Sequence, residues 1–385
     1  MKVLVIGHAY IAKINRLKWK ILANKYKNIK LKILIPKIWQ AALFKIEAGD
    51  LSKDNLENCE FEALDTFYSG NEILYRFKFF ELFKILKNFK PDLVHVEQGD
   101  NAFVYFQIIL LCKILSKILR FKTKFTFFTW VNWRHKKSFK YKIFWQFIEN
   151  FNLRNSDAAF VGNHEAKIIL QEKKFLKDTK VLLQLGVDEE IFTSEHCACN
   201  DKKNIIGFIG RFTQEKGIFL LLEAYCNLEK EFENWRLLFV GDGPEKSNLI
   251  SFIKKLNLQE KVILINSVTH EKIAKIIKTL EILVLPSYDT PNWKEQFGHV
   301  LIEAMACKIP VIGSNAGNIA QVIDNAGLIF EQKNILDLTN KLKIFMTNQD
   351  LHKEFGQLGY QRFKENFSYD FIAKETYNFW MKLNK

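Results

Sequence analysis

Short apolar runs alternate with amphipathic stretches along almost the whole chain of 385 residues. Runs too short for a buried helix and without polar alternation are typical of strands buried on both faces. In the first half of the chain, such runs lie at 2–7, 31–36, 92–97, 124–130, 157–162 and 180–185. Helical patterns lie between most of them, as at 72–89, 101–119 and 138–154. Repeated β-α units of this kind predict an α/β fold with a doubly wound parallel sheet.

A second series of the same kind follows a polar stretch at 193–203. Its apolar runs lie at 204–210, 235–241, 261–265, 282–286, 309–313 and 327–330. We therefore expect an N-terminal Rossmann-like domain at 1–192, a linker at 193–203 and a second Rossmann-like domain at 204–367, with a C-terminal helix at 368–385 that packs back on the first domain. Ligands of such sheets bind beyond the carboxyl ends of the strands, so we expect the two domains to face each other across a deep cleft that holds the active site.

Composition excludes several classes of protein. The longest apolar run, 102–112, is shorter than the ~18 residues of a membrane span. The run after Met1 is a strand by its length and not a signal peptide, and the six cysteines form no CxxC pair, so we expect a cytoplasmic protein with reduced thiols. His196 to Cys199 could ligate a metal, but no second ligand pair stands at a workable spacing, which favours an exposed linker.

The net charge of +14 is concentrated in the first half of the chain. Residues 1–200 hold 33 Lys and Arg against 21 Asp and Glu, whereas residues 201–385 hold 24 against 22. This asymmetry indicates an anionic partner for the first domain: a membrane surface, a nucleic acid or an anionic substrate. The alternative is a generally Lys-rich chain with solvated faces.

Cations gather where the first strand of the second series ends. Arg211 follows Gly210 at the end of that strand, and Lys216 stands just before the next helical stretch. Two cations beside the free N–H groups of a helix N-terminus form an anion site that suits a diphosphate. The alternative is a surface loop with two charges. A second glycine-edged turn, Gly241-Asp242-Gly243-Pro244, follows the next strand and belongs to the same edge of the sheet.

Two glutamates stand out in the segment KEQFGHVLIEAMACKIPVIGS, residues 294–314. Glu295 precedes an apolar helix, and Glu303 lies about a turn and a half into it. Glutamate is rarely buried without a partner. Glu303 either accepts hydrogen bonds from the vicinal hydroxyls of a sugar or ribose, or forms a core ion pair with a buried Arg or Lys; the residues alone leave both open.

The chain resembles retaining glycosyltransferases of the large family often called family 4, which have the GT-B architecture. Four motifs in the family's order carry the resemblance: the pair Glu295 and Glu303 with seven residues between them, Gly210-Arg211 to Lys216-Gly217, VGDGPE at 240–245 and LGVDEEIF at 185–192. The segments 127–133 and 156–166 are similar to a bacterial subgroup associated with surface polysaccharides such as lipopolysaccharide. The likeness is strongest over 185–325.

The resemblance implies a role for each matching position. Arg211 and Lys216 would hold the donor's diphosphate and stabilise the leaving group, Glu295 would contact the donor sugar, and Glu303 would bind the ribose hydroxyls. The other donor-binding positions are Gly210, Gly241, Asp242, Phe297, Gly298, His299 and, against the base, the loop 266–268 with Val268.

The acceptor side departs from the family's pattern at two places. Gly7-His8 stands where many relatives have two glycines, and Trp130 stands where many have a histidine. Gly7 and His8 would face the acceptor. Trp130 either stacks on an acceptor sugar, to which Asn132 would bond, or packs in the core.

The reaction that the resemblance implies is glycosyl transfer from a UDP-, GDP- or ADP-linked sugar, with retention of configuration by front-face attack and no protein nucleophile. No two aspartates stand two residues apart, so we expect no metal and no further cofactor. The acceptor would be a saccharide or a lipid-linked sugar. The segment 134–149 mixes cations with aromatic residues as interfacial helices do, which predicts peripheral binding to an anionic membrane surface, on the inner face of the cytoplasmic membrane.

Two other functions compete with this one. A nucleotide-sugar epimerase or a phosphorylase would keep the fold, but an epimerase lacks this set of four motifs and no cofactor lysine for a phosphorylase can be pointed to. A nucleic-acid-binding module would explain the charge but neither the glutamate pair nor the glycine-edged loops. We therefore expect no nucleic-acid partner.

Overall fold

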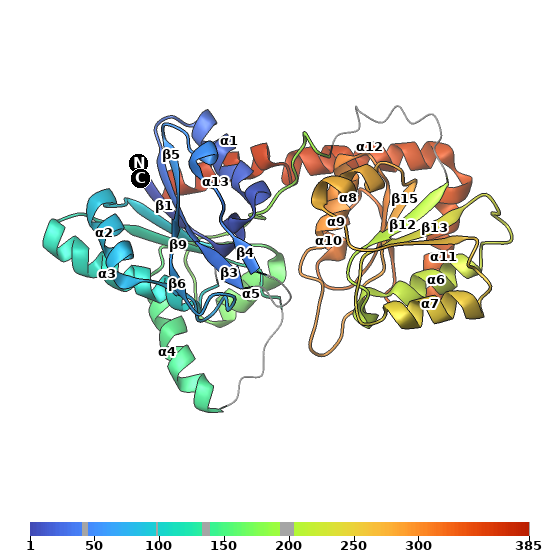
Figure 1. Ribbon diagram of the computed structural model, residues 1–385, viewed down its shortest axis with the longest axis horizontal. Helices are drawn as coiled ribbons and strands as arrows, with labels where there is room; N and C mark the ends of the chain where they lie inside the picture. The colour runs from blue at the N-terminus through green and yellow to red at the C-terminus, as the bar shows by residue number, and fades with distance from the viewer. Residues whose placement is uncertain (41–44, 98, 133–138, 193–203, 385) are drawn as a thin grey trace. The chain divides into compact units, whose positions relative to one another are not determined.

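The computed structural model describes residues 1–40, 45–97, 99–132, 139–192 and 204–384 (Figure 1). The chain forms two compact units. Unit 1 comprises Met1–Gly186 and Tyr369–Lys385, and unit 2 comprises Val187–Ser368.

The division lies before the predicted linker, and 187–192 belongs to unit 2 rather than to the first domain. Val187 pairs with Ser368 in a parallel bridge, and the buried ring of Phe192 meets the ring of His270 edge-on at 5.0 Å. These contacts tie 187–192 to unit 2. The linker predicted at 193–203 lies outside the described residues.

Unit 1 is built on a seven-stranded parallel sheet. The strand order is β11-β10-β9-β8-β1-β2-β5. The strands are β1 (Lys2–Ile6), β2 (Lys30–Pro36), β5 (Cys59–Leu64), β8 (Leu93–Val96), β9 (Lys124–Thr129), β10 (Ala158–Val161) and β11 (Thr179–Val181). The antiparallel pairs β3 (Ile38–Gln40) with β4 (Lys45–Glu47) and β6 (Thr66–Phe67) with β7 (Arg76–Phe77) stand apart from it.

Strand β5 was not predicted from the sequence. This strand ends the sheet, and its residues Glu60 and Glu62 alternate with Phe61, so it carries no continuous apolar run. Edge strands tolerate charge on their exposed side.

The helices of unit 1 cover both faces of its sheet (Figure 1). α1 (Leu17–Lys25) packs with α13 (Tyr369–Leu383), the helix that ends the described chain. α2 (Phe79–Phe89), α3 (Phe103–Leu119) and α4 (Phe139–Asn155) pack side by side in sequence order, and α5 (His164–Glu172) links β10 to β11.

A buried charge network lies where β1 and β8 end. Glu97 follows β8, and its Oε1 atom accepts hydrogen bonds from the hydroxyl of Tyr10 and, at 3.3 Å, from Nζ of Lys18. Nε2 of His95 lies 3.2 Å from the same oxygen. Burial acts to raise the pKa of Glu97, but Lys18 and the hydrogen bonds of His95 and Tyr10 outweigh it and lower this pKa to about 2.

Unit 2 has a six-stranded sheet in the order β14-β13-β12-β15-β16-β17, with every pair parallel. The strands are β12 (Ile205–Ile209), β13 (Arg236–Val240), β14 (Val262–Ile265), β15 (Ile282–Leu285), β16 (Val311–Ser314) and β17 (Leu328–Phe330). They correspond to the six apolar runs of the second series. This is the strand order of dinucleotide-binding sheets, and it reverses between β12 and β15.

Two groups of helices sandwich this sheet (Figure 1). One face carries α6 (Ile218–Cys226), α7 (Lys246–Lys255) and α11 (Ile335–Thr347), which share a hydrophobic core with β12 and β13. The other face carries α8 (His270–Ile277), α9 (His299–Ala306), α10 (Ile319–Ile323) and α12 (Gln349–Asn366). Ligands of such sheets bind at the carboxyl ends of the strands where the order reverses, which in unit 2 is the edge formed by the loops after β12 and β15.

Candidate functional site

The loops after β12 and β13 are bound to each other by backbone hydrogen bonds. The N–H of Gly210 donates to the carbonyl of Val240 at 3.0 Å, and the N–H of Phe212 donates to the carbonyl of Asp242 at 2.9 Å. Gly241 has φ +152°, and a Cβ atom there would lie 1.9 Å from the carbonyl oxygen of Gly210. Glycine is therefore required at 241, because no side chain fits between the two loops. Arg211 lies exposed on this edge.

Lys216 and Glu295 meet at this edge of the sheet. Lys216 ends the short 3₁₀ turn Gln214–Lys216, and its Nζ atom lies 2.5 Å from Oε2 of Glu295. The hydroxyl of Ser287, two residues after β15, donates to the same oxygen at 3.1 Å. The ammonium group of Lys216 also lies 4.9 Å from the centre of the Trp293 ring. Lys216 and Glu295 were predicted from the sequence, whereas Ser287 and Trp293, which carry no motif of their own, were not.

The backbone of Glu295 is held from the loop after β16. The N–H of Asn318 donates to the carbonyl of Glu295 at 3.0 Å. Gly317 has φ +50°, and a Cβ atom there would lie 2.3 Å from that carbonyl oxygen. The position of Glu295 is thus set by three loops at the same sheet edge.

Helix α9 begins beside the end of β15. Gly298 caps the helix with φ +80°, and a Cβ atom there would lie 2.6 Å from a methyl carbon of Leu285. Phe297 is buried against Phe367, and its ring centre lies 4.9 Å from that of His299. The N–H groups of the first helical turn, to which His299 belongs, therefore start at this edge.

Glu303 is buried in α9, with 8% of its surface exposed. Burial raises the pKa of its carboxyl group to about 7. Nε2 of His270, the first residue of α8, lies 3.8 Å from Oε1 of Glu303. Within the described ranges, no Lys or Arg forms an ion pair with Glu303, so the hypothesis of a core ion pair with Lys or Arg is not the arrangement found.

Asp242 and Val268 lie further along the same side of the sheet. Oδ1 of Asp242 accepts from the N–H of Gly243 at 2.8 Å, which lowers the pKa of Asp242 together with the neighbouring Lys246. Lys246 bonds to Oδ1 of Asn266 at 2.6 Å and so joins the loops after β13 and β14. Val268 is half-buried between β14 and α8. Lys246 is a third cation that was not predicted from the sequence, although it begins α7 directly after the glycine-edged turn.

The four residues predicted for the acceptor side lie in unit 1. A Cβ atom on Gly7 would lie 2.6 Å from the ring of Tyr10, so this position is closely packed. His8 stacks on Trp39 with ring centres 4.4 Å apart, and its Nε2 lies 3.4 Å from Glu72. These contacts fix the imidazole of His8.

Trp130 and Asn132 follow β9 in unit 1. Trp130 is half-buried, its carbonyl accepts a hydrogen bond from Asn163 at 3.0 Å, and its ring lies 5.6 Å from that of Phe128. Asn132 is fully buried.

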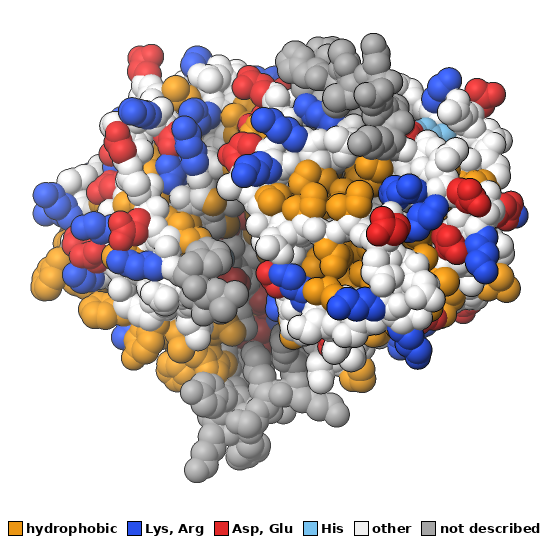
Figure 2. Space-filling model, turned by 45° about the vertical axis from the view of Figure 1, so that its right-hand side comes forward, with side chains coloured by type: hydrophobic (Ala, Val, Ile, Leu, Met, Phe, Trp, Pro, Cys, Tyr) orange, Lys and Arg blue, Asp and Glu red, His pale blue; other side chains and the backbone are white. Residues whose placement is uncertain are grey.

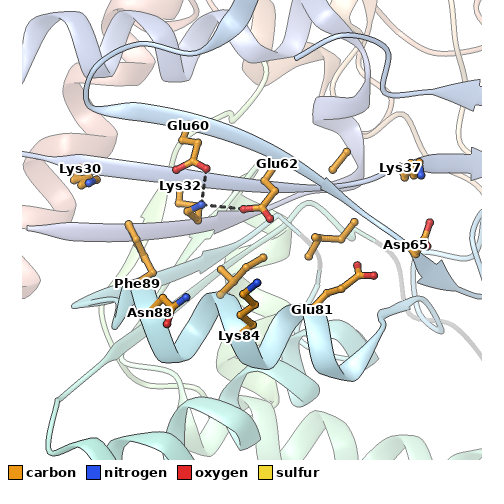
Figure 3. A pocket seen from close by; sticks show the side chains of 13 residues that line it. Lys30, Lys32, Lys37, Glu60, Glu62, Asp65, Glu81, Lys84, Asn88 and Phe89 are labelled. Carbon is orange, nitrogen blue, oxygen red and sulfur yellow. Dashed lines mark hydrogen bonds and ion pairs between the residues drawn. The ribbon is translucent and has the colours of Figure 1, made fainter. Parts of the chain in front are cut away.

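Two hollows lie away from these residues. A groove of about 650 Å³ in unit 1 runs between β5 and α2, where Lys32 pairs with Glu60 at 2.7 Å and with Glu62 at 2.9 Å (Figure 3). A cavity of about 290 Å³ in unit 2 is lined by Gln214, Gly217, Phe219, Leu220, Tyr288 and Lys333. Neither hollow is lined by the predicted site residues.

In the part of the chain that the structure describes, no group of three His, Cys, Asp or Glu side chains is placed to hold a metal ion. The candidate ligands His196 to Cys199 lie outside that part. Over the same residues, no helix combines the length and the apolar character needed to cross a membrane.

Comparison with known sequences gives a consistent set of relatives. Residues 191–362 match the family described as Glycosyl transferases group 1. An uncharacterized glycosyltransferase of Methanocaldococcus jannaschii, MJ1178, is 28% identical over 61% of each chain. The N-acetyl-alpha-D-glucosaminyl L-malate synthase of Bacillus anthracis is 23% identical over 58% of this chain and 59% of its own. The chain thus spans about three fifths of the length of these two relatives. The amylovoran biosynthesis glycosyltransferase AmsD of Erwinia amylovora is 26% identical over 74% of this chain and 76% of its own.

Solved structures share the fold over the whole chain. A glycosyltransferase from Rickettsia africae has a TM-score of 0.72 at 18% identity and covers 100% of this chain and 98% of its own. Anabaena Alr3699/HepE in complex with UDP has a TM-score of 0.71 at 14% identity and covers 99% of this chain and 100% of its own. These likenesses confirm the predicted GT-B fold of two doubly wound Rossmann-like domains. The segment 191–362, which matches the family described as Glycosyl transferases group 1, lies within unit 2 and includes Arg211, Lys216, Glu295 and Glu303.

Proposed function

We propose that this protein is a retaining glycosyltransferase, which moves a sugar from a nucleotide-diphosphate sugar to a saccharide or lipid-linked acceptor in the synthesis of a surface polysaccharide. The observation that carries the proposal is the pair of Lys216 and Glu295, 2.5 Å apart at the sheet edge where the strand order of unit 2 reverses. The family match over 191–362 and the name of the relative AmsD support the same reaction and the same use. An epimerase or a nucleic-acid-binding module would leave these matches unexplained.

The donor's diphosphate would lie against Arg211 and Lys216. Glycosyl transfer places negative charge on the departing phosphate, and fixed cations stabilise that charge most in the transition state. An ammonium group has three N–H donors, so Lys216 can keep its bond to Glu295 and still donate to phosphate oxygens. Because two cations supply this stabilisation and the sequence has no Asp-x-Asp pair, we propose that neither a metal nor another cofactor is needed.

Glu295 and Glu303 would hold the two ends of the donor. The carboxylate of Glu295, oriented by Ser287 and Lys216, would accept hydrogen bonds from the sugar hydroxyls. Glu303, on α9, would accept two hydrogen bonds from the ribose diol, and the first amides of α9 would donate to the sugar or phosphate. Anabaena Alr3699/HepE forms a complex with UDP, which favours a nucleotide diphosphate as the leaving group here.

The donor can be identified by thermal shift with UDP-, GDP- and ADP-sugars, since a ligand that binds the folded state raises its melting temperature. With that donor, Lys216→Ala should lower kcat by at least about tenfold while circular dichroism stays unchanged, because one phosphate-stabilising charge is lost. Lys254→Ala, an exposed lysine on α7, is the matched control and should turn over normally. Normal turnover by Lys216→Ala would contradict the assignment of Lys216 to the diphosphate.

We propose further that unit 1 binds an anionic membrane surface, which would place the enzyme on the inner face of the cytoplasmic membrane. Exposed apolar side chains gather on α2, α3 and α4, namely Phe79, Phe80, Leu110, Ile114, Ile118, Ile143, Phe144 and Phe147. Hydrophobic side chains lie at the left and lower left of Figure 2, on the side where Figure 1 has these helices. Exposed lysines stand beside them at 84, 87, 113 and 117. Cations next to aromatic and aliphatic side chains are typical of surfaces that enter the lipid interface.

This surface differs from the predicted one in its extent. Membrane contact was predicted at 134–149. Residues 134–138 of this segment lie outside the described residues, and residues 143, 144 and 147 are exposed on α4. The apolar residues of α2 and α3 were missed because they stand next to buried residues of the same helices and so look like core in the sequence.

Flotation with vesicles that contain anionic lipid tests this surface. The protein should float with such vesicles at low salt and remain unbound with neutral ones. The double variant Phe80→Ser with Ile118→Ser should bind at least about thirtyfold less, because each exposed side chain contributes ~1–2 kcal/mol on entering lipid. Leu336→Ser in unit 2 is the control, since Leu336 is 69% exposed and Ile118 is 67% exposed. Failure of the wild type to bind anionic vesicles at low salt would rule out the surface.

A further inference from the structure

His270 lies beside Glu303, and none of the four family motifs contains it. It is the first residue of α8, directly after the loop that joins β14 to this helix. α8 and α9 pack next to each other in unit 2 (Figure 1), which brings Nε2 of His270 to 3.8 Å from Oε1 of Glu303. This distance exceeds that of a hydrogen bond, but a movement of about 1 Å would form one.

The ring of His270 is held from its other side. The buried ring of Phe192 meets it edge-on at 5.0 Å, and Phe192 is itself fixed by the hydrogen bond from its N–H to the carbonyl of Asp188 at 2.9 Å. Burial lowers the pKa of His270, while the nearby carboxylates of Asp188 and Glu271 act to raise it. Burial has the larger effect, so the pKa of His270 is below its usual value, and the two carboxylates offset only part of that effect.

Among the described residues, no lysine or arginine forms an ion pair with Glu303. Its helix packs against α8, α10 and α12, and in the described part of unit 2 the ionisable side chain within ion-pair distance of its carboxylate is His270. His299 stands one turn earlier on α9, where its ring contacts Phe297. Burial of Glu303 favours its neutral form, whereas only the ionised carboxylate is an acceptor on both oxygens and can bind each hydroxyl of a diol with one of them.

We propose that His270 is a positioning residue for Glu303: it takes the proton that the carboxyl group gives up when the ribose diol binds, and holds the resulting carboxylate toward the diol. The step moves one proton from a carboxyl oxygen of Glu303 to Nε2 of His270, so no proton enters or leaves the protein. The inference rests on the proposed function, because it takes the ribose of a nucleoside diphosphate as the ligand of Glu303.

The proposal predicts how pH changes nucleotide affinity. With a neutral residue at 270, Glu303 should be protonated below about pH 7, the value to which burial raises its pKa, and affinity should fall there. With His270 present, the proton passes from Glu303 to the imidazole when the diol binds, and affinity should persist to lower pH. With lysine at 270, the fixed positive charge should carry the affinity to still lower pH.

Calorimetric titration with UDP, GDP or ADP over about pH 5.5 to 8.5 tests the proposal in the full chain. His270→Gln should bind within about twofold of the wild type at the alkaline end and about tenfold more weakly near pH 6, since the ionised fraction of a carboxyl group falls about tenfold for each pH unit below its pKa. His270→Lys should retain nucleotide affinity to a lower pH than the wild type does. The 2′,3′-dideoxy nucleotide has no diol, so with it the wild type and both variants should show the same pH dependence.

The outcomes separate the two proposals. If the wild type binds its nucleotide, two results would overturn the role of His270. One is that His270→Gln loses the same affinity at every pH. The other is that the substitution still changes the pH dependence of binding with the dideoxy nucleotide. Failure of the wild type to bind any of the three nucleotides would overturn the proposed function itself and the role of His270 with it.

Discussion

Two buried glutamates of this chain have pKa values shifted in opposite directions. Glu97 in unit 1 is bonded to Lys18, His95 and Tyr10, and its pKa is lowered to about 2. Glu303 in unit 2 has its pKa raised to about 7 by burial. A paired buried carboxylate stabilises the folded state, whereas a poorly paired one destabilises it, and residues of the second kind cluster at binding sites.

The raised pKa of Glu303 fixes the sign of its effect on stability. The folded state binds this proton more tightly than the unfolded state, so the free energy of unfolding should fall as pH rises from about 4.5 to about 7. Glu303→Gln should therefore raise the free energy of unfolding by roughly 1–3 kcal/mol at about pH 8, with no gain near pH 4. Urea denaturation at the two pH values measures this. A stability gain equal at both pH values would contradict the account.

Glu97→Gln is the matched comparison at the residue scale. Here the folded-state pKa is below the unfolded value, so the contribution of Glu97 should be present above about pH 4.5 and should be lost as pH falls toward about 2. The variant leaves the fully buried Lys18 without its carboxylate, and we expect a loss of ~3–5 kcal/mol at about pH 8. At about pH 8, Glu303→Gln should thus raise the free energy of unfolding, and Glu97→Gln should lower it.

At the scale of elements, α13 is the helix whose place is least evident from the chain order. It follows α12 of unit 2, yet it packs on α1 of unit 1. Trp380 is fully buried and stacks on Trp19, with ring centres 5.7 Å apart and planes 3° from parallel. The amphipathic pattern of 368–385 indicates a helix that needs an apolar partner, and this stack is part of that partner surface.

Trp380→Ala should remove the stack of α13 on Trp19 of α1. Emptying a fully buried tryptophan site costs ~3–5 kcal/mol, so the unfolding transition of unit 1 should move to a correspondingly lower urea concentration. Lys382→Ala, on the exposed side of the same helix, is the control and should change little. An unchanged midpoint for Trp380→Ala would show that α13 does not stabilise unit 1.

At the scale of the whole molecule, each unit has its own sheet and its own buried core, and the chain passes between them only at 186–187 and 368–369. Domains connected in this way often unfold in separate steps. The charge asymmetry also belongs to this scale, because the basic excess lies in residues 1–200 and the glycosyl transferases group 1 match lies in 191–362.

We therefore expect two thermal transitions in calorimetry. The nucleoside diphosphate that binds should raise only the transition of unit 2, because ligand binding stabilises the unit that holds the site. Trp380→Ala should lower only the other transition. If calorimetry shows a single transition, and both nucleotide binding and Trp380→Ala shift it, the two units do not unfold independently.

Much of this protein could be predicted from local sequence. The apolar runs identified all six strands of unit 2 and six of the seven in the sheet of unit 1, because a buried parallel strand has a signature within a few neighbouring residues. The missed strand, β5, carries charged residues at alternate positions and lacks that signature. Arg211, Lys216 and Glu295 could be selected because each stands at a strand or helix end that the pattern itself marks. Glu303 could be selected because a glutamate is unusual inside an apolar helix.

The tertiary structure alone decided which of these residues meet. Lys216 and Glu295 are 79 positions apart, and Ser287 and His270 joined the site through loops with no motif of their own. It also decided that 187–192 belongs to unit 2 and that Glu303 has a histidine rather than a lysine or arginine beside it. The physical reason is that strand and helix patterns arise from neighbours along the chain, whereas ion pairs, burial and pKa values depend on distances through space.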